Sequence, residues 1–210
     1  MKLQDIGNIP FSMSILKALF PDYKAIAGKA KRLEDSNDII RLKKGLYVLN
    51  PERYRLRLNE FLVANHLYGP SYVSKQSALR FYGLIPERVF EVTSMTIGLT
   101  KKYTNKIATF SYTHCTEAYF STGIRSMEED EINFLIASPE KALCDLMIYT
   151  PNLNLRYLSE MQSFLEHDIR FEMSELKNLD PEIFKEIKSH GKKKTMISKL
   201  IELVENERNV

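Results

Sequence analysis

The sequence is poor in cysteine, with only Cys115 and Cys144 in 210 residues. Two thiols are too few for a framework of disulfide bonds, and neither stands in the Cys-x-x-Cys spacing of redox and zinc sites. The four histidines are scattered, without the spacing of metal ligands. We therefore expect two small, buried thiols, no metal site and no cofactor.

Long apolar runs are also absent. Runs such as Phe61-Leu62-Val63-Ala64 are far shorter than the roughly 20 residues that a membrane-spanning helix needs. The opening MKLQDIGNIP lacks the apolar stretch of a signal peptide. We expect a cytoplasmic protein without a membrane partner. A hydrophobic content of 44% and a charged content of 27% are typical of a globular chain with a real core.

Charge is distributed unevenly along the chain. Residues 1–58 contain 12 lysines and arginines against 6 aspartates and glutamates, which is a balance of +6. Residues 59–210 contain 18 against 21, a balance of −3. A basic first quarter on a mildly acidic remainder indicates an anionic partner for the basic part. An incidental solvated surface is the alternative explanation.

Two short helices are predicted in this basic part. Ser12 is a suitable N-cap for a helix over Met13–Leu19. Asp22 is a suitable N-cap for a second helix, from about Tyr23 to Ser36. Three apolar residues at helical spacing form the buried stripe of the second helix. They are Ile26, Ala30 and Leu33.

The second helix is predicted to have a basic outer face. At about 100° per residue, four residues point away from the buried stripe. They are Lys24, Gly28, Lys31 and Arg32, and Lys29 lies on the flank. A glycine inside a helix costs roughly 0.5–1 kcal/mol relative to alanine, which suggests that something needs room at Gly28. A bound duplex and a close contact between helices explain this equally well.

A hairpin with a basic tip follows in IIRLKKGLYVL, residues 39–49. Its arms alternate, so we expect one face to pack on the two helices. That face consists of Ile40, Leu42, Leu46 and Val48. Lys43 and Lys44 occupy the tip, where they would face the phosphates of a neighbouring duplex. Gly45 permits the tight turn and a close approach.

Helix, tight turn, helix and basic-tipped hairpin is the order of elements in a winged helix-turn-helix. In that fold the second helix enters the major groove and the hairpin is the wing. Many small helical domains also carry a lysine-tipped hairpin, so the pattern is only moderately specific. The sequence predicts a DNA-binding site and no catalytic residues. The candidate DNA-binding residues are Lys24, Gly28, Lys29, Lys31, Arg32, Arg41, Lys43, Lys44 and Gly45.

The next part of the chain mixes helical and β-type patterns. A helix from Glu52 to Tyr68 is predicted to link the basic part to the rest, and its early arginines either contact DNA or are solvated. A short helix is predicted over Lys75–Tyr82. Two β-rich runs, Val89–Gly98 and Lys106–Cys115, are expected to pair in an antiparallel manner.

An acidic loop is predicted over Ser126–Glu131, between weaker strand patterns at residues 118–124 and 133–137. Ser138 as N-cap, with Pro139 at the first helical position, then predicts a well-formed helix start. Further helices are expected in the last sixty residues. They cover Leu155–Glu166, Ser174–Leu179, Pro181–Ser189 and Lys193–Glu207.

The predicted fold class is α+β in three parts, which we call the head, the body and the tail. The head is a winged helix-turn-helix (residues 1–52), the body a mixed α/β domain with a small antiparallel sheet (residues 53–150), and the tail a helical extension packed on the body (residues 151–210). No flexible linker separates head and body, so we expect them to be packed together.

One cluster of charged residues is compatible with catalysis. Glu140, Lys141 and Asp145 lie close in sequence, and a nuclease uses such groups around a metal ion. A helix start explains Glu140 and Lys141, however, and Asp145 follows Lys141 at i+4, as in a simple surface pair. Glu91 is a candidate second carboxylate that nothing in the sequence places nearby. We expect no enzymatic activity, and a metal-dependent nuclease is the alternative.

Four separated segments resemble one protein family. They are KGLY at Lys44–Tyr47, SKQSALRFYGLIPERVFEVTS at Ser74–Ser94, ATFSYTHC at Ala108–Cys115 and IASPEKALCDLM at Ile136–Met147. In this order and spacing they are similar to the AbiEi antitoxins, the regulator half of the AbiE (type IV) abortive-infection toxin–antitoxin pairs. Residues beyond 150 match no motif of that family.

The resemblance implies a DNA-binding autorepressor and antitoxin. An N-terminal winged helix would bind the promoter of its own operon, and a larger C-terminal domain would counter a nucleotidyltransferase toxin, with or without a stable direct complex. Paired operator sites would need two copies on the DNA, as a dimer or by cooperative binding. The alternative is a stand-alone winged-helix transcriptional regulator, which would have no toxin gene beside it.

Overall fold

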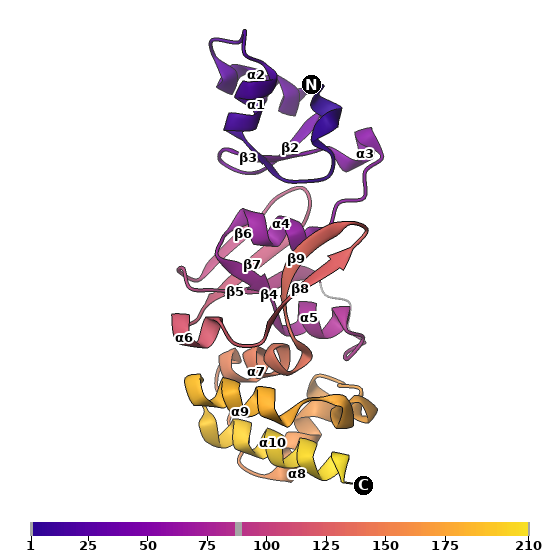
Figure 1. The fold of residues 1–210 in the computed structure, drawn as a ribbon, viewed down its shortest axis with the longest axis vertical. Helices are drawn as coiled ribbons and strands as arrows, with labels where there is room; N and C mark the ends of the chain where they lie inside the picture. Colours follow the sequence, from indigo (N-terminus) through magenta and orange to yellow (C-terminus); the bar gives the residue numbers. More distant parts are fainter. Residues whose placement is uncertain (1, 87–89, 210) are drawn as a thin grey trace.

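The computed structural model describes residues 2–86 and 90–209, and it stacks three layers along one long axis (Figure 1). The head lies at one end, a large sheet with its helices lies in the middle, and the tail helices lie at the other end. Val89, the first residue of a predicted strand, falls outside the described residues.

The head contains short helices and a small sheet. Its elements are η1 (Leu3–Ile6), β1 (Phe11–Ser12), α1 (Met13–Leu19), α2 (Ile26–Asp35), β2 (Ile39–Lys43) and β3 (Leu46–Leu49). The predicted bounds of α1 are confirmed. The second helix begins later than predicted, with Ala25 rather than Asp22 at its N-cap. Residues 21–25 instead form the turn between the helices, where the Tyr23 N–H donates to the Phe20 carbonyl at 3.1 Å.

The head sheet is antiparallel in the order β1-β3-β2. Phe11 pairs with Tyr47, and Ile39 pairs with Leu49 across the hairpin. The register shifts between Arg41 and Lys43. The turn that follows needs a left-handed residue, which Gly45 supplies with a φ of 80°.

Both faces of the hairpin are covered, and the predicted packing face is wrong. Ile39, Tyr47 and Leu49 face the head helices and join the head core with Leu16 and Leu33. The opposite face, predicted to cover those helices, packs on the body. It consists of Leu42 and Val48, which are buried there, and of the half-buried Ile40 and Leu46. Apolar residues occupy both faces of these arms, so alternation alone did not decide which face met the helices.

The connection between head and body is not one helix, as predicted for Glu52–Tyr68. It contains α3 (Pro51–Tyr54) and α4 (Glu60–Leu67), with an extended segment between them. Arg55 takes a left-handed φ of 52°, which ends α3. The side chain of Asn59 then caps α4, accepting from the backbone N–H groups of Phe61 and Leu62 at 2.9 and 3.0 Å.

The body contains a mixed sheet of six strands rather than a small antiparallel one. Its order is β6-β7-β5-β4-β9-β8. The strands are β4 (Ser71–Val73), β5 (Glu91–Thr96), β6 (Lys101–Thr104), β7 (Thr109–His114), β8 (Ile124–Glu129) and β9 (Ile132–Ala137). The predicted antiparallel pairing of β5 with β7 is wrong, because these two strands are parallel. Residues 101–104, which lie between the two predicted runs, form the edge strand β6.

The predicted acidic loop is also a strand. Residues 126–129 belong to β8, which pairs with β9, and only Asp130 and Glu131 form the turn. The pattern at 118–124 is not a strand, since α6 (Glu117–Phe120) lies there. The body's other helices are α5 (Lys75–Phe81) and α7 (Pro139–Tyr149). The predicted cap of α7 is confirmed, because the Ser138 hydroxyl accepts from the Lys141 backbone N–H at 3.3 Å.

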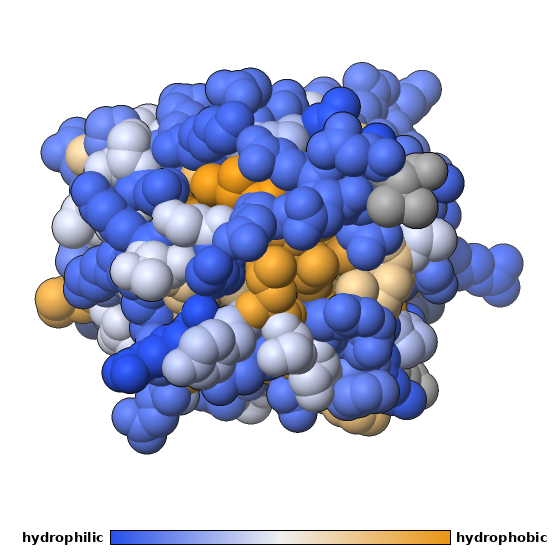
Figure 2. Space-filling view, turned by 90° about the horizontal axis from the view of Figure 1, so that it is seen from below, coloured by the Kyte–Doolittle hydropathy of each residue, from blue (hydrophilic) through white to orange (hydrophobic). Residues whose placement is uncertain are grey.

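The tail is helical, as predicted. It contains α8 (Leu158–Ser163), η2 (Phe164–Asp168), η3 (Met173–Asn178), α9 (Pro181–His190) and α10 (Lys194–Arg208). Its buried residues join those of the body in a single apolar cluster. Figure 2, which views the molecule from this end, shows a mostly hydrophilic surface around a central apolar area. Both cysteines are free and buried.

Among residues 2–86 and 90–209, no helix is both long enough and apolar enough to cross a bilayer.

Candidate nucleic-acid interface

The candidate site is built on α2, which lies at the end of the molecule opposite the tail (Figure 1). Ala30 and Leu33 are buried against Leu16 of α1 and the inner face of the head sheet. Because an α-helix has 3.6 residues per turn, this packing leaves the opposite side of α2 in solvent. The exposed residues of that side are Ala27, Gly28, Lys31, Arg32 and Asp35, and the exposed Lys24 lies two residues before the helix begins.

The cations of this outer face are poorly neutralised. Lys24 and Arg32 have no acidic partner within the described part of the chain. Lys31 faces Asp35 at 3.5 Å, but the two side chains are 74% and 63% exposed. An exposed i,i+4 pair of this kind is worth only about 0.3–0.5 kcal/mol. These ammonium and guanidinium groups therefore remain available to another anion.

Lys29 is held differently from its neighbours. Its Nζ lies 4.6 Å from the ring centroid of Phe20 and 5.0 Å from that of Tyr23. Both rings belong to the segment between α1 and α2, and they pack edge to face. The half-buried Lys29 therefore packs on both rings and helps to fix the turn between the helices.

Gly28 has open space around it. A methyl group added to its Cα would meet nothing within 4 Å in the described structure. The explanation by a close helix–helix contact is therefore wrong. The glycine leaves a short stretch of α2 backbone bare on the basic face, where another molecule can approach closely.

The hairpin contributes less to the open surface than its sequence suggests. Arg41 donates to Glu34 of α2 at 2.6 Å, and this hydrogen bond raises the pKa of the guanidinium. The half-buried Lys43 turns toward the body, where its Nζ donates to the Leu67 carbonyl at 2.6 Å. Of the two lysines expected to face a duplex from the tip, only Lys44 is exposed.

The hairpin tip and the outer face of α2 are separate parts of the head. The Gly45 carbonyl accepts from the Met13 backbone N–H at 3.2 Å, which places the tip beside the first residue of α1. The structure thus gathers Lys24, Gly28, Lys31 and Arg32 on one side of α2. It does not place Lys43 with them.

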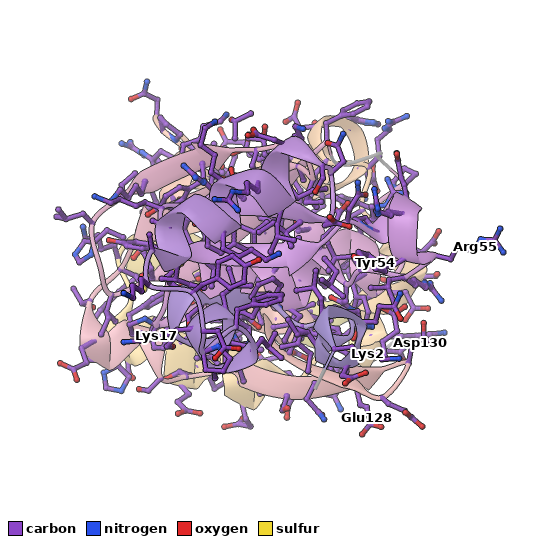
Figure 3. All side chains as sticks on the ribbon, turned by 90° about the horizontal axis from the view of Figure 1, so that it is seen from above. Lys2, Lys17, Tyr54, Arg55, Glu128 and Asp130 are labelled. Carbon is purple, nitrogen blue, oxygen red and sulfur yellow. The ribbon has the colours of Figure 1, made fainter. Side chains whose placement is uncertain are left out.

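The arginines that follow the head serve different purposes. Arg53 pairs with Asp38 at 2.8 Å, and Arg57 pairs with Asp130 of the β8–β9 turn at 2.6 Å. Burial alone would raise the pKa of Asp38, but hydrogen bonds from Ser36 and Tyr54 and the charge of Arg53 lower it overall. Seen from above, Arg55 extends into solvent at the edge of the molecule (Figure 3).

The cluster considered for catalysis is buried, so the interpretation as a surface pair is wrong. Lys141 and Asp145 are both 0% exposed, with Nζ and Oδ1 3.6 Å apart. Asp145 also accepts from the Tyr119 hydroxyl at 2.6 Å, from Ser74 at 2.6 Å and from Tyr72 at 3.0 Å. The Lys141 ammonium donates to the Tyr119 carbonyl at 2.8 Å. Each charge therefore has several polar partners inside the protein.

This network holds α7 against the sheet. Burial lowers the pKa of Lys141, and the charge of Asp145 opposes that change. Burial and the same carboxylate raise the pKa values of Tyr72 and Tyr119 well above the ordinary range. Burial likewise raises the pKa of Cys115 to about 11, which keeps the thiol protonated. The network has the features of a structural element, since its carboxylate and ammonium groups are sealed from solvent.

The other carboxylates of the nuclease alternative do not meet Asp145 in an open site. Glu140 is buried and accepts from the Asp180 backbone N–H at 3.1 Å. Glu91 on β5 pairs with Lys102 at 2.9 Å. Within residues 2–86 and 90–209, no three His, Cys, Asp or Glu side chains are grouped to hold a metal ion.

Comparison with protein-family models and with curated proteins finds no match to this chain.

One group of exposed cations, on the edge strand of the body, is not among the predicted DNA-binding residues. Lys101, Lys102 and Lys106 all lie on or just after β6 and are exposed. A signal for them was present, because residues 92–116 contain no aspartate or glutamate. The buried network had no comparable signal, since Lys141 and Asp145 show the i,i+4 spacing of any helical surface pair.

Proposed function

We propose that this protein binds duplex DNA through the outer face of α2. We further propose that it is the autorepressor and antitoxin of an AbiE-like operon. The observation that carries the first part is the state of the α2 cations: Lys24 and Arg32 are exposed and have no acidic partner in the described structure. Cations that stay unpaired in water release counterions from DNA when they meet its phosphates, which favours binding.

The arrangement of the head supports the same proposal. A strand, two helices joined by a tight turn, and a hairpin follow one another, with the sheet in the order β1-β3-β2. This order of elements is compatible with a winged helix-turn-helix, whose second helix would enter the major groove. The groove is about 12 Å wide and admits one helix. The bare backbone at Gly28 suits a helix that approaches a duplex closely.

The proposed contact is led by the helix rather than by the wing. Lys44 is the exposed lysine of the hairpin tip, whereas Lys43 is bonded to the body. The apolar outer face of the hairpin is likewise covered by the body. We therefore expect sequence preference to come from α2, with Lys44 adding a phosphate contact at most.

The antitoxin part of the proposal rests on the resemblance of four segments, residues 44–47, 74–94, 108–115 and 136–147, to the AbiEi family. The two longest resembling segments include α5 and most of α7, which pack on the central sheet of the body. The partner proposed for the body is a nucleotidyltransferase toxin. Restored growth on co-expression with such a toxin from the adjacent gene would support this part. The absence of such a gene would favour a stand-alone regulator.

The DNA-binding part is tested by a mobility shift with the duplex upstream of the protein's own gene, at two or more salt concentrations. A shuffled duplex of the same length is the control. The proposal predicts tighter binding to the upstream duplex and a steep loss of affinity with salt on both. Binding that is absent at low salt would contradict it.

A further inference from the structure

The six-stranded sheet of the body ends in two edge strands that carry different charges. One edge is β6, whose exposed side chains include Lys101 and Lys102. The other edge is β8, which carries Arg125, Glu128 and Glu129. An edge strand presents backbone N–H and C=O groups to solvent, so it can pair with a strand of another chain unless its side chains prevent this. Lysines on two copies of β6 would repel each other, whereas β8 contains charges of both signs.

The outer side of β8 is open to solvent. Within residues 2–86 and 90–209, this strand pairs only with β9, along its whole length from Ile124 to Glu129. Alternate residues of an antiparallel strand direct their backbone groups to opposite sides, so about half of those in β8 point away from the sheet. Asp130 and Glu131 close the hairpin with left-handed φ values of 51° and 63°, which match the twist of paired strands. Seen from above, Glu128 lies at the periphery of the molecule (Figure 3).

One face of β8 carries a basic, an apolar and an acidic side chain in turn. Because side chains alternate between the two faces of a strand, Arg125, Met127 and Glu129 share a face. Arg125 is exposed and has no acidic partner in the described part of the chain, and Met127 is half-buried. Glu129 accepts from the Asn59 side chain at 3.0 Å and lies 3.9 Å from Arg57, but its side chain is 46% exposed. Since a carboxylate has two oxygens that accept several hydrogen bonds, Glu129 can bind a further cation.

This order of charges is self-complementary. Two antiparallel copies of β8 related by a twofold axis at Met127 place each Arg125 opposite the Glu129 of the other copy. Opposite charges directly across an antiparallel pair are favourable, and like charges there are unfavourable. An axis at Glu128 would oppose two glutamates, and an axis at Arg125 would oppose two arginines. An axis at Ser126 would place Arg125 opposite Met127. The charges therefore select the pairing that is centred on Met127.

We propose that β8 pairs with β8 of a second copy of this chain, antiparallel and about a twofold axis at Met127, so that the two sheets become one. The same surface of both copies forms the interface, as in most symmetric dimers. Backbone hydrogen bonds between the two edges supply affinity, and the two pairs of Arg125 with Glu129 fix the register. The inference goes beyond the proposed function and does not depend on it, because it concerns the body alone.

The test is sedimentation velocity on the full chain without DNA, over a wide range of protein concentrations. The wild type should show an equilibrium between monomer and dimer. Arg125→Glu places like charges opposite each other twice and should raise the dissociation constant of the dimer by about tenfold or more. Glu129→Arg should do the same, and the variant with both substitutions should recover most of the association, because opposite charges meet again. The charge-matched control, Lys177→Glu in the tail, should associate like the wild type.

Three results would overturn the inference, and none of them bears on DNA binding by α2. The first is a wild type that stays monomeric at the highest concentration. The second is equal association of the wild type and Arg125→Glu, which would assign the dimer to another surface. The third is a double variant that associates no better than either single variant. Arg125 is exposed and without an acidic partner in the described chain, so the unfolding midpoint of Arg125→Glu should equal that of the wild type.

Discussion

The head and the body use the same kinds of charged side chains in opposite ways. On α2, Lys24 and Arg32 extend into water without a partner in the described structure, and Lys31 has only an exposed neighbour. In α7, Lys141 and Asp145 are fully buried and each has several polar partners. Both helices carry a basic residue followed by an aspartate at i+4. Burial, rather than spacing, decides whether such a pair is a binding surface or a structural element.

The difference has an energetic basis. Two opposite charges in water attract each other weakly, so the exposed cations of α2 lose little when they exchange one anion for another. Charges removed from water need nearly complete compensation, and the loss of one partner leaves the other uncompensated. We therefore expect substitutions in the body to change stability, and substitutions on α2 to change binding.

The largest expected effect is on the body. Asp145→Ala should lower the free energy of unfolding by about 3–5 kcal/mol, because it leaves the Lys141 ammonium buried without its counter-charge. Three hydroxyl groups would also lose their acceptor. Denaturant unfolding measures the loss. If the variant is too unstable to purify, Tyr72→Phe, which removes one of these hydrogen bonds, should lose about 1 kcal/mol.

The exposed pair on α2 is the matched control for that substitution. Asp35→Ala removes the carboxylate at the equivalent i+4 position and should change the free energy of unfolding by less than about 0.5 kcal/mol. Equal losses for Asp35→Ala and Asp145→Ala would contradict the distinction between the two helices.

A smaller effect is expected at the contact between head and body. Lys43→Ala removes the hydrogen bond to the Leu67 carbonyl and should lower the free energy of unfolding by about 1–2 kcal/mol, with little change in the salt dependence of DNA binding. Lys44→Ala should instead lower the slope of log K for DNA binding against log salt concentration by about 0.9, and it should leave the free energy of unfolding unchanged. The two adjacent lysines are each other's control. Identical behaviour of the two variants would contradict their different environments.

A small change of the opposite sign, a gain in stability, is expected at Gly28. Alanine fits the open space there and should stabilise α2 by about 0.5–1 kcal/mol. The same methyl group should weaken DNA binding if α2 approaches a duplex at this point. Thermal unfolding and a mobility shift on one preparation would measure both. A variant that is more stable and binds as well as the wild type would remove Gly28 from the interface.

Much of the local structure was predictable because its signals are local. The bounds of α1, the hairpin over residues 39–49 and the cap of α7 at Ser138 all follow from neighbouring residues. The wrong predictions concern partners that are distant in sequence. Alternation showed that the hairpin had apolar faces, but only the fold showed that the body covers the face with Leu42 and Val48.

Strand pairing was unpredictable for the same reason. Residues 101–104 contain two lysines, as a solvated connection would, yet they pair with β7 as an exposed edge strand. Because β6 is a strand that runs antiparallel to β7, β5 and β7 are parallel neighbours instead of an antiparallel pair. The burial of Lys141 could not be predicted from the sequence either. The charge of Lys141 is compensated by the Tyr119 carbonyl and by Asp145, and Asp145 is itself bonded to residues as distant in sequence as Tyr72.

The most direct measurement is the salt dependence of binding to the upstream duplex by the variant with Lys24→Ala, Lys31→Ala and Arg32→Ala. The loss of each cation that meets a phosphate should lower the slope of log K against log salt concentration by about 0.9. We therefore expect this slope to decrease by roughly two to three, while the midpoint of unfolding stays unchanged. A slope and affinity equal to those of the wild type would show that the outer face of α2 does not bind DNA.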